Sequence, residues 1–408
     1  MGFLLRVRAV LLISAFTVVM AGPNLPTPLL PGYRARLGLG AFGLTVLFST
    51  YLLALVGVLL SVGSAARRSS PRALLFAGLL LSVMSDVCLA WGASSLAGVL
   101  AGRVLSGFAV GLSTGAAAVL LRYHGEPRSA SATALCALLG SAAGTALTAV
   151  LAEYLPAPRM LSYLVHAGVS VLCIGLLGAR REFAEPRRTD IRRADGGGSV
   201  VQPGKLGRFS VASATGLGAW VTAGLMVALV PSYAAALLGA TNLVVAASPV
   251  VLYLLAACGG SAVAGRRSPR VELAAAPAFM AAGLVLTALS GPLRSTVVLL
   301  LGAVVTGVGQ GLAFRGGLFA ALAVSTPERQ GVATSRFSAL AYLGAAGATL
   351  GMGLLTGWVG LDTAFRWAAA LFAVGALALG ILARRLFADR SADRVPDGLV
   401  AGLPGREE

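Results

Sequence analysis

The chain has 408 residues, of which 57% are hydrophobic and only 12% are charged. Soluble globular domains carry about 25% charged residues, so this composition excludes an ordinary soluble enzyme. It also excludes disordered and disulfide-stapled proteins. The net charge of +17 does not indicate nucleic-acid binding, because the basic residues separate apolar runs and form no continuous patch. We therefore expect a membrane protein with no nucleic-acid partner.

Twelve uncharged stretches, each bounded by arginine or by turn residues, predict twelve transmembrane helices. Helices are expected because backbone groups in hydrocarbon must form their hydrogen bonds within the segment. The uncharged run 210–265 is too long for one helix and predicts two, with a turn near 239–242. The predicted spans are 9–30, 41–62, 73–91, 96–121, 130–151, 160–177, 211–235, 244–264, 273–289, 296–324, 333–358 and 367–382.

The start of the first span, with Arg6 and Arg8 before an apolar stretch, also fits a signal peptide. The uncharged run continues to Tyr33, however, which is longer than the apolar core of a signal peptide. We therefore expect this segment to be the first transmembrane helix.

The distribution of basic residues predicts the orientation of the chain. With twelve spans, 24 of the 32 basic residues fall on the face that holds both termini and 5 on the opposite face, while Arg103, Arg315 and Arg336 lie within spans. Cytoplasmic loops carry the excess of lysine and arginine, so both termini are expected in the cytoplasm. Lysine occurs once, at Lys205, against 31 arginines, as in GC-rich bacterial genomes. We expect a multi-pass protein of a bacterial cytoplasmic (inner) membrane.

The spans divide into two halves. Residues 1–178 are expected to form one six-helix bundle and residues 210–384 a second, with a flexible cytoplasmic linker at 179–209 and a disordered cytoplasmic tail at 385–408. The halves match at an offset near 200: Pro31 and Tyr33 correspond to Pro231 and Tyr233, and Gly107 and Gly111 to Gly307 and Gly311. Two six-span halves insert the same way up. They predict a pseudo-two-fold axis along the membrane normal and a site between the halves near mid-membrane.

These features resemble the major facilitator superfamily over about residues 5–385, and in particular its bacterial efflux members. The resemblance rests on three motifs. The loop after span 2 matches at Gly63, Arg68 and Arg72, but Arg67 stands where the family has an aspartate that helps to close the cytoplasmic gate. Span 4 matches at Arg103, Ser106, Gly107 and Gly111. Span 5 has the glycines of drug/proton antiporters at Gly140 and Gly144, with Thr145 in place of their proline. The resemblance implies alternating access and links Arg103 to proton coupling.

Charged residues inside the membrane cost at least about 2.5 kcal/mol each and need a reason. Asp86 is the only acid well inside a predicted span, and Arg103 is on the next span at a similar distance from the turn at Ser94 and Ser95. At 1.5 Å per residue both lie about 10 Å below the surface, so we predict an ion pair between them. That pair either locks span 3 to span 4 or takes part in proton coupling.

The remaining candidates are polar side chains on spans expected to line a cavity. Asn24 stands among prolines that must kink span 1, and it either faces the cavity or satisfies the broken helix. Gln310, Tyr51, Tyr253 and Tyr342 are further cavity candidates, whereas His166 is expected to be a packed or interfacial residue. Arg315 has no acidic partner evident in the sequence; it either faces the cavity and attracts an anion, or it snorkels to the surface or bonds to carbonyls. Arg336 is expected to be an interfacial anchor.

The sequence contains no catalytic constellation, phosphate-binding loop or metal-ligand cluster. We therefore expect a secondary transporter, not an enzyme. It would have no cofactor, would use a proton gradient as energy source, and would act as a monomer in the lipid bilayer. The preferred function is export of a small, partly apolar molecule. Uptake of a small anion through Arg315 and Arg103, and a non-transporting sensor or scaffold, are the alternatives.

Overall fold

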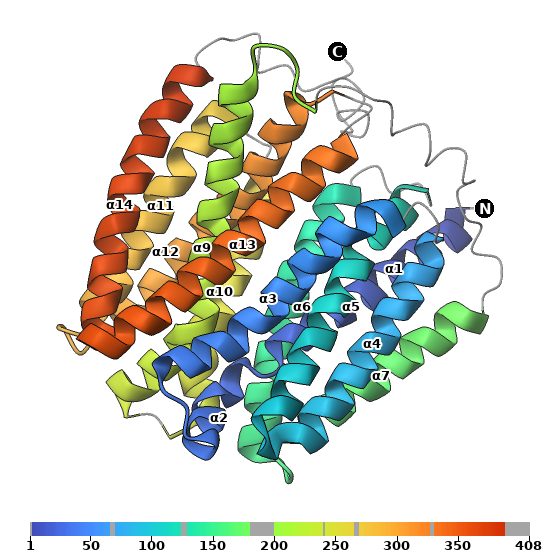
Figure 1. Cartoon of the computed structure of the whole chain (residues 1–408), viewed down its shortest axis with the longest axis vertical. Helices are drawn as coiled ribbons and strands as arrows, with labels where there is room; N and C mark the ends of the chain where they lie inside the picture. Colours follow the sequence, from blue (N-terminus) through green and yellow to red (C-terminus); the bar gives the residue numbers. More distant parts are fainter. Residues whose placement is uncertain are drawn as a thin grey trace.

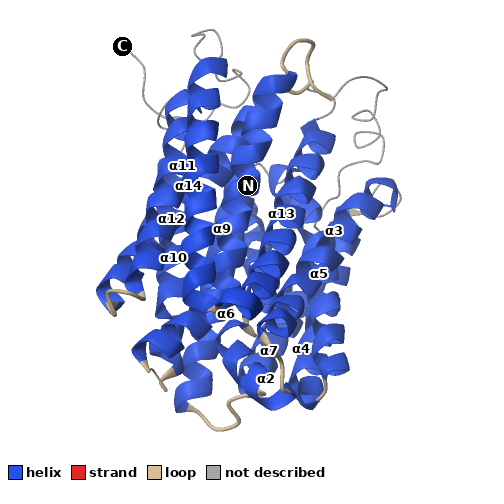
Figure 2. Cartoon of the chain, turned by 60° about the vertical axis from the view of Figure 1, so that its left-hand side comes forward, coloured by secondary structure: helices blue, strands red, loops and turns tan. Residues whose placement is uncertain are grey.

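The computed structural model describes residues 2–65, 70–123, 129–179, 200–239, 241–264, 269–326 and 330–387. Within these ranges the protein is helical (Figure 2). The only β-type pairing there is an isolated bridge between Val201 and Ser325. Twelve of the described helical segments are long and apolar enough to cross a membrane. The expected all-helical fold with twelve spans is confirmed.

The first half of the chain contains six spans, of which the first is broken. Its helices are α1 (Gly2–Ala21), α2 (Leu30–Leu37), α3 (Ala41–Ala65), α4 (Pro71–Trp91), α5 (Leu96–Tyr123), α6 (Ser129–Tyr154) and α7 (Leu161–Ala179). Two short 3-10 turns, Gly22–Asn24 and Thr27–Leu29, join α1 to α2 within one span. Proline lacks the backbone N–H that a helix needs, and Pro23, Pro26 and Pro28 all fall in this break.

The second half contains six unbroken spans. They are α9 (Leu206–Leu238), α10 (Leu243–Val263), α11 (Pro269–Ser290), α12 (Thr296–Ala323), α13 (Gln330–Val359) and α14 (Leu361–Leu386). The turn expected near 239–242 is present, because Gly239 ends α9 in a left-handed conformation with φ of 58° and the side chain of Asn242 caps the first N–H groups of α10.

Three spans extend well beyond their predicted bounds, and one of them is the last, which runs from Leu361 to Leu386 instead of 367–382. The first span extends to Leu37, because the 3-10 turns carry it past the prolines. Helix α9 begins at Leu206, inside the stretch expected to be linker, and the segment before it is attached to the second half: the backbone N–H of Gln202 donates to the carbonyl of Val324 at 3.0 Å. Most of the expected linker (180–199) and the expected disordered tail from residue 388 onward lie outside the described residues.

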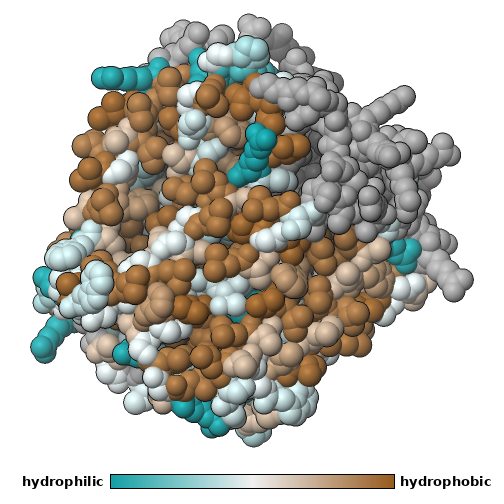
Figure 3. Space-filling view, in the orientation of Figure 1, coloured by the Kyte–Doolittle hydropathy of each residue, from teal (hydrophilic) through white to brown (hydrophobic). Residues whose placement is uncertain are grey.

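The two halves stand side by side, with α9–α14 forming one bundle and α1–α7 the other (Figure 1). We call the end where α1 begins and α14 finishes the terminal end, and the other the opposite end. The halves meet along two seams, α3 against α13 and α6 against α10. In Figure 3 the visible face is dominated by hydrophobic residues, as a lipid-facing surface requires. Trp91, Trp358 and Trp367 are exposed near the opposite end, where an aromatic belt would meet the lipid headgroups.

The sequence repeat corresponds to a repeated helix contact. A Cβ atom added to Gly107 would clash with the carbonyl oxygen of Tyr51, and one added to Gly307 would clash with the carbonyl oxygen of Tyr253. Glycine therefore lets α5 cross α3, and α12 cross α10, at backbone-contact distance. The matched glycines are packing residues in both halves.

Candidate functional site

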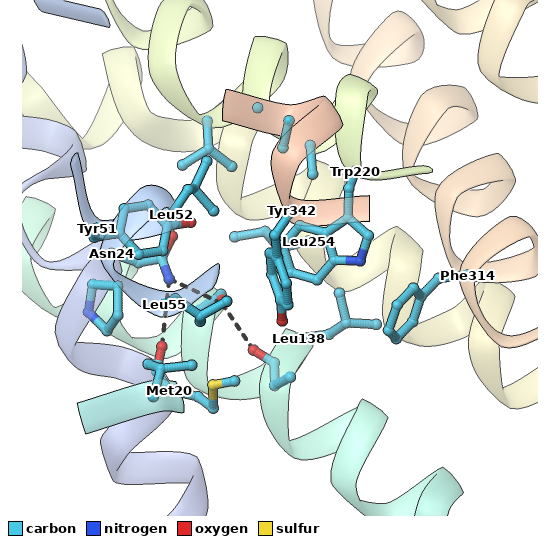
Figure 4. A pocket seen from close by; sticks show the side chains of 18 of the residues that line it. Met20, Asn24, Tyr51, Leu52, Leu55, Leu138, Trp220, Leu254, Phe314 and Tyr342 are labelled. Atoms are coloured by element: carbon cyan, nitrogen blue, oxygen red, sulfur yellow. Dashed lines mark hydrogen bonds between the residues drawn. The ribbon is translucent and has the colours of Figure 1, made fainter. Parts of the chain in front are cut away.

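A cavity of about 700 Å³, including the part open to solvent, lies between the two halves. It is lined from one side by the break in the first span with α3, α5 and α6, and from the other by α9, α10, α12 and α13 (Figure 4). None of the described lining residues is charged; most are aliphatic or aromatic, such as Leu52, Leu138 and Leu254. This apolar lining, with a few polar groups among aliphatic and aromatic side chains, is typical of a site for a small organic molecule.

Four residues expected at the cavity lie on its lining: Asn24, Tyr51, Gln310 and Tyr342. Tyr253 does not; it is fully buried where α12 crosses α10. The reason is helix rotation, since Tyr253 and the lining residue Leu254 are adjacent on α10 and point to different faces.

The amide of Asn24 is bonded to the first half of the chain. Its Nδ2 donates to Ser141 Oγ on α6 at 2.9 Å and to the carbonyl of Met20 at 3.4 Å. Met20 is one turn back on α1, so the side chain of Asn24 satisfies a carbonyl at the broken helix end. Asn24 therefore does both of the things considered for it: it faces the cavity and it stabilises the break.

An aromatic wall covers the second-half side of the cavity. Trp220 on α9 lies with its ring centroid 4.2 Å from that of Tyr342 on α13 and 5.6 Å from that of Phe314 on α12, the latter in an edge-to-face arrangement (Figure 4). Neither Trp220 nor Phe314 was predicted from the sequence to be a site residue. A signal was present for Trp220, because it is the only tryptophan in the middle of a predicted span and the other three are near span ends.

Arg103 does not pair with Asp86, so the predicted ion pair is wrong. The Arg103 guanidinium instead donates to three backbone carbonyls: Leu47 at 3.0 Å and Phe48 at 2.9 Å on α3, and Pro23 at 2.5 Å in the broken span. It also lies over the ring of Tyr51, 4.4 Å from its centroid. Five donors in a rigid fork suit several carbonyls at once, and the break in span 1 exposes one of them. Ser106, next in the span 4 motif, donates to the Arg103 carbonyl at 2.8 Å.

Asp86 pairs with His166, which was expected only to be a packed residue. Asp86 Oδ2 lies 2.7 Å from His166 Nδ1, and His166 Nε2 lies 2.8 Å from the carbonyl oxygen of Val18. A carbonyl can only accept, so Nε2 carries a hydrogen. One further proton must then lie between Nδ1 and Oδ2, whichever atom holds it. The buried pair is thus a site for one exchangeable proton, joining α4, α7 and α1.

This pair lies behind the wall of the cavity. A Cβ atom on Gly22 would come within 3.2 Å of the His166 ring, so the imidazole is packed against the start of the break in span 1. The next two residues, Pro23 and Asn24, line the cavity. Movement of the His166 ring would therefore displace Gly22 and, through the backbone, the cavity residues Pro23 and Asn24.

Arg315 does not line the cavity. It lies on α12 and its guanidinium donates to the carbonyl of Ser261 on α10. Glu272, at the start of α11, is also buried within a span, and its carboxylate would be 3.2 Å from a Cβ on Gly316. Glu272 lies in the first turn of α11, at the edge of its span, whereas Asp86 lies well inside α4, as expected.

The family-like motifs have packing roles where the structure describes them. Gly140 and Gly144 place α6 directly on the end of α1, where an added Cβ would clash with backbone oxygens. Arg72 donates to the carbonyl of Leu177 on α7 at 3.0 Å. Arg67 and Arg68 lie outside the described residues, and Gly63 is in the last turns of α3.

Among the described residues, the hydrogen bonds between the halves lie between the middle of the spans and the opposite end. Glu153 Oε2 on α6 accepts from the backbone N–H of Leu243 at 2.8 Å, at the start of α10. Tyr154 Oη accepts from Asn242 Nδ2 at 3.3 Å, and Ser49 Oγ donates to the carbonyl of Ala346 at 3.4 Å. We call the first two contacts the α6–α10 latch. The seams are thus closed at the end remote from the termini.

Comparison with known proteins supports one family. The model of the Major Facilitator Superfamily matches residues 10–293. A solved POT family transporter in complex with a thioalcohol-conjugated peptide is similar over 93% of this chain and 96% of its own, with 13% identity and a TM-score of 0.74. A bacterial homologue of the human lysosomal transporter Spinster, in an inward-facing and occupied conformation, is similar over 95% and 98%, with 13% identity and a TM-score of 0.70. No curated protein matches the sequence.

Proposed function

The chain belongs to the Major Facilitator Superfamily, and we propose that it exports a small, uncharged, partly apolar molecule in exchange for protons. Its family and the transporter fold of its structural neighbours make it a membrane-embedded secondary transporter and not an enzyme. The proposal adds the polarity of the substrate, the coupling ion and the direction.

The uncharged lining of the cavity is the observation that carries the proposal. A charged ligand there would lose its hydration and meet no opposite charge among the described lining residues. The two arginines considered as counter-charges for an anion, Arg103 and Arg315, do not line the cavity and donate to backbone carbonyls. This argues against uptake of a small anion. It argues equally against a zwitterion such as 5-aminolevulinic acid, which one of the similar POT family structures holds.

The Asp86–His166 pair supports proton coupling. Removing its one shared proton would leave the Nδ1 lone pair facing a carboxylate at 2.7 Å, which is repulsive. The imidazole would have to move, and His166 is bonded to Val18 and packed against Gly22 on the span that forms the cavity wall. Proton loss and the shape of the cavity are therefore linked through α1, as an exchanger requires.

The direction rests on the orientation. We place the terminal end in the cytoplasm because 24 of the 32 basic residues fall on that face, and the seams are then closed toward the outside. An exporter passes through a state closed toward the outside when it takes up its substrate from the cytoplasm. A complete cavity between two halves also favours transport over a role as a sensor or scaffold.

The test uses the full-length protein in vesicles with an acidic lumen and a trapped pH indicator. The probes are benzamide and benzyl alcohol, with benzenesulfonate and phenyltrimethylammonium as charged counterparts. Exchange predicts that adding an uncharged probe outside raises the lumen pH, because a proton leaves as the probe enters. A fall in lumen pH would indicate co-transport with protons and would contradict exchange. A response to the charged probes alone would contradict the proposed substrate polarity. Protein-free vesicles are the control.

A further inference from the structure

The cavity contains two side-chain amides, and they differ in their hydrogen bonding. Asn24, on the first-half wall, donates to Ser141 and to the carbonyl of Met20. Gln310, on the second-half wall, is 1% exposed, and its Oε1 is buried without a hydrogen-bond partner among the described residues. Buried amides in native proteins are normally bonded, because an unbonded one costs about 1–3 kcal/mol. The buried oxygen of Gln310 is therefore available to accept a hydrogen bond from a molecule in the cavity.

The surroundings of Gln310 restrict what could bind. Phe314 is one helical turn further along α12, on the same face, and Trp220 packs edge-to-face against it. Tyr342 packs against the other side of Trp220 and points toward Leu138 across the cavity (Figure 4). A ligand that reaches Gln310 therefore lies along aromatic rings, which favour a planar partner.

We propose that Gln310 is the recognition residue of this transporter, and that it binds the polar edge of a planar, uncharged substrate carrying adjacent hydrogen-bond donor and acceptor groups, as in an aromatic carboxamide. A glutamine side chain offers one acceptor oxygen and an NH₂ donor side by side. It pairs in two-point fashion with a group that has the same arrangement, in the way that glutamine reads adenine. A charged group would satisfy only one side of it.

The inference deepens the proposed function, since it takes the cavity as the substrate site, but it does not depend on protons or on direction. The two walls of the cavity then have different roles. Asn24 is a positioning residue that holds the broken span, whereas Gln310 contacts the substrate. The aromatic wall sets the planarity of the ligand, and the amide sets its polar edge.

The test measures binding to the purified full-length protein without any gradient. Benzamide, which has donor and acceptor, is compared with acetophenone, which has the same ring and only the acceptor. Tryptophan fluorescence reports binding, because Trp220 is the tryptophan on the cavity and Trp91, Trp358 and Trp367 are exposed at the membrane-facing surface. Trp220→Phe should remove the ligand-dependent change in fluorescence, while calorimetry follows binding in that variant.

We expect the wild-type protein to bind benzamide about tenfold more tightly than acetophenone, and Gln310→Met to remove that preference, because one or two net hydrogen bonds are lost. Gln202→Met is the matched control, since Gln202 lies outside the cavity and bonds to Ser325. It should leave both affinities unchanged. If Gln310→Met does not fold, Gln310→Asn, which keeps the amide but shortens its reach, should show the same loss.

Equal binding of benzamide and acetophenone by the wild-type protein, or an unchanged preference in Gln310→Met, would overturn the inference. These outcomes are separate from failure of the proposed function. A benzamide preference that depends on Gln310 without any proton movement would support the recognition role and contradict proton exchange. Proton movement that benzamide drives equally in the wild-type protein and in Gln310→Met would support proton exchange and contradict the recognition role.

Discussion

The two halves of the protein share their helix packing but differ in the chemistry they bring to the cavity. At the matched positions Gly107 and Gly307, glycine lets one helix cross another against a tyrosine carbonyl. Four residues earlier the halves diverge: the first has Arg103, bonded to three carbonyls, and the second has Ala303, fully buried. Backbone contact tolerates only glycine, so it is retained in both copies, whereas side chains on the other faces are free to differ.

The difference separates two kinds of work. The first half contains the broken span, the arginine Arg103 that donates to three backbone carbonyls, and the Asp86–His166 proton site. The second half has intact spans, an aromatic wall and the unbonded amide of Gln310. A proton-coupled exchanger, which is the function proposed above, needs a site that responds to protons and a surface that selects a ligand. In this protein we assign the first task to one repeat and the second to the other.

The largest effect is expected from Arg103→Leu. This change leaves the exposed carbonyl of Pro23 without its donor and removes bonds to Leu47 and Phe48, and each bond to a charged group is worth about 1.5–3 kcal/mol. The broken span should no longer be held, so we expect a large fall in thermal stability and loss of transport.

Arg315→Leu is the control in the second half, where the helices do not depend on an arginine at a break. It should lower the melting temperature less than Arg103→Leu does. Arg103→Lys should not rescue the first variant, because an ammonium group cannot match three carbonyls in a fixed fork. Equal losses of thermal stability in the two arginine variants would show that each half depends on its buried arginine to the same extent.

Asp86→Asn should uncouple transport from protons while the fold survives. An amide can still bond to His166, but it removes the ionisable carboxyl from the proton site. We expect proton movement driven by substrate to fall by at least about tenfold, because the carboxyl that takes part in binding the proton is gone. Exchange of labelled for unlabelled substrate should continue. His166→Gln should give the same pattern, and coupled transport in either variant would reduce the pair to a structural role.

Gly107→Ala and Gly307→Ala should destabilise the protein to a similar extent, by about 1–3 kcal/mol, because each added methyl group would meet a carbonyl oxygen. Gly115→Ala on α5 is the control, since nothing lies within 4 Å of its added Cβ. Thermal unfolding in detergent measures all three. If only one of the matched variants is destabilised, the two crossings are not equivalent.

The smallest effect is expected at the α6–α10 latch. The Glu153 carboxylate accepts from an N–H at the start of α10, where a negative charge is favoured by about 0.3–1 kcal/mol. Glu153→Gln removes that charge and should raise the population open at the opposite end by a few-fold at most. Distances between spin labels on α6 and α10 would report the shift. An unchanged distribution would mean that the α3–α13 seam alone keeps this end closed.

Part of the candidate site was predictable from residue type. Prolines 23, 26 and 28 predict a broken span, and Asn24, Tyr51, Gln310 and Tyr342 were chosen because polar groups in hydrocarbon need a reason to be there. Tyr253 met the same criterion but faces the crossing with α12. The rotation of a helix about its axis is set by packing, and an almost uniformly apolar span carries little sequence signal about it.

The partner of Asp86 was not predictable. Counting residues from a turn places Asp86 and Arg103 at similar depth, but it says nothing about which of several neighbouring helices each side chain faces. His166 is 80 residues away on α7, and only the packing of α7 against α4 brings it within 2.7 Å. Arg103 instead donates to a carbonyl of the broken span, which becomes available as a partner only once the chain has folded.

The amino-acid sequence alone determined that the chain is a twelve-helix membrane protein made of two similar halves, because hydropathy and glycine spacing act locally or at a fixed offset along the chain. Only the tertiary structure decided which polar groups meet. The Asp86 carboxyl meets the His166 imidazole, the Arg103 guanidinium meets backbone carbonyls, and the amide oxygen of Gln310 has no hydrogen-bond partner among the described residues. Apolar helices pack by shape, and shape is the combined result of many weak contacts that no single stretch of sequence specifies.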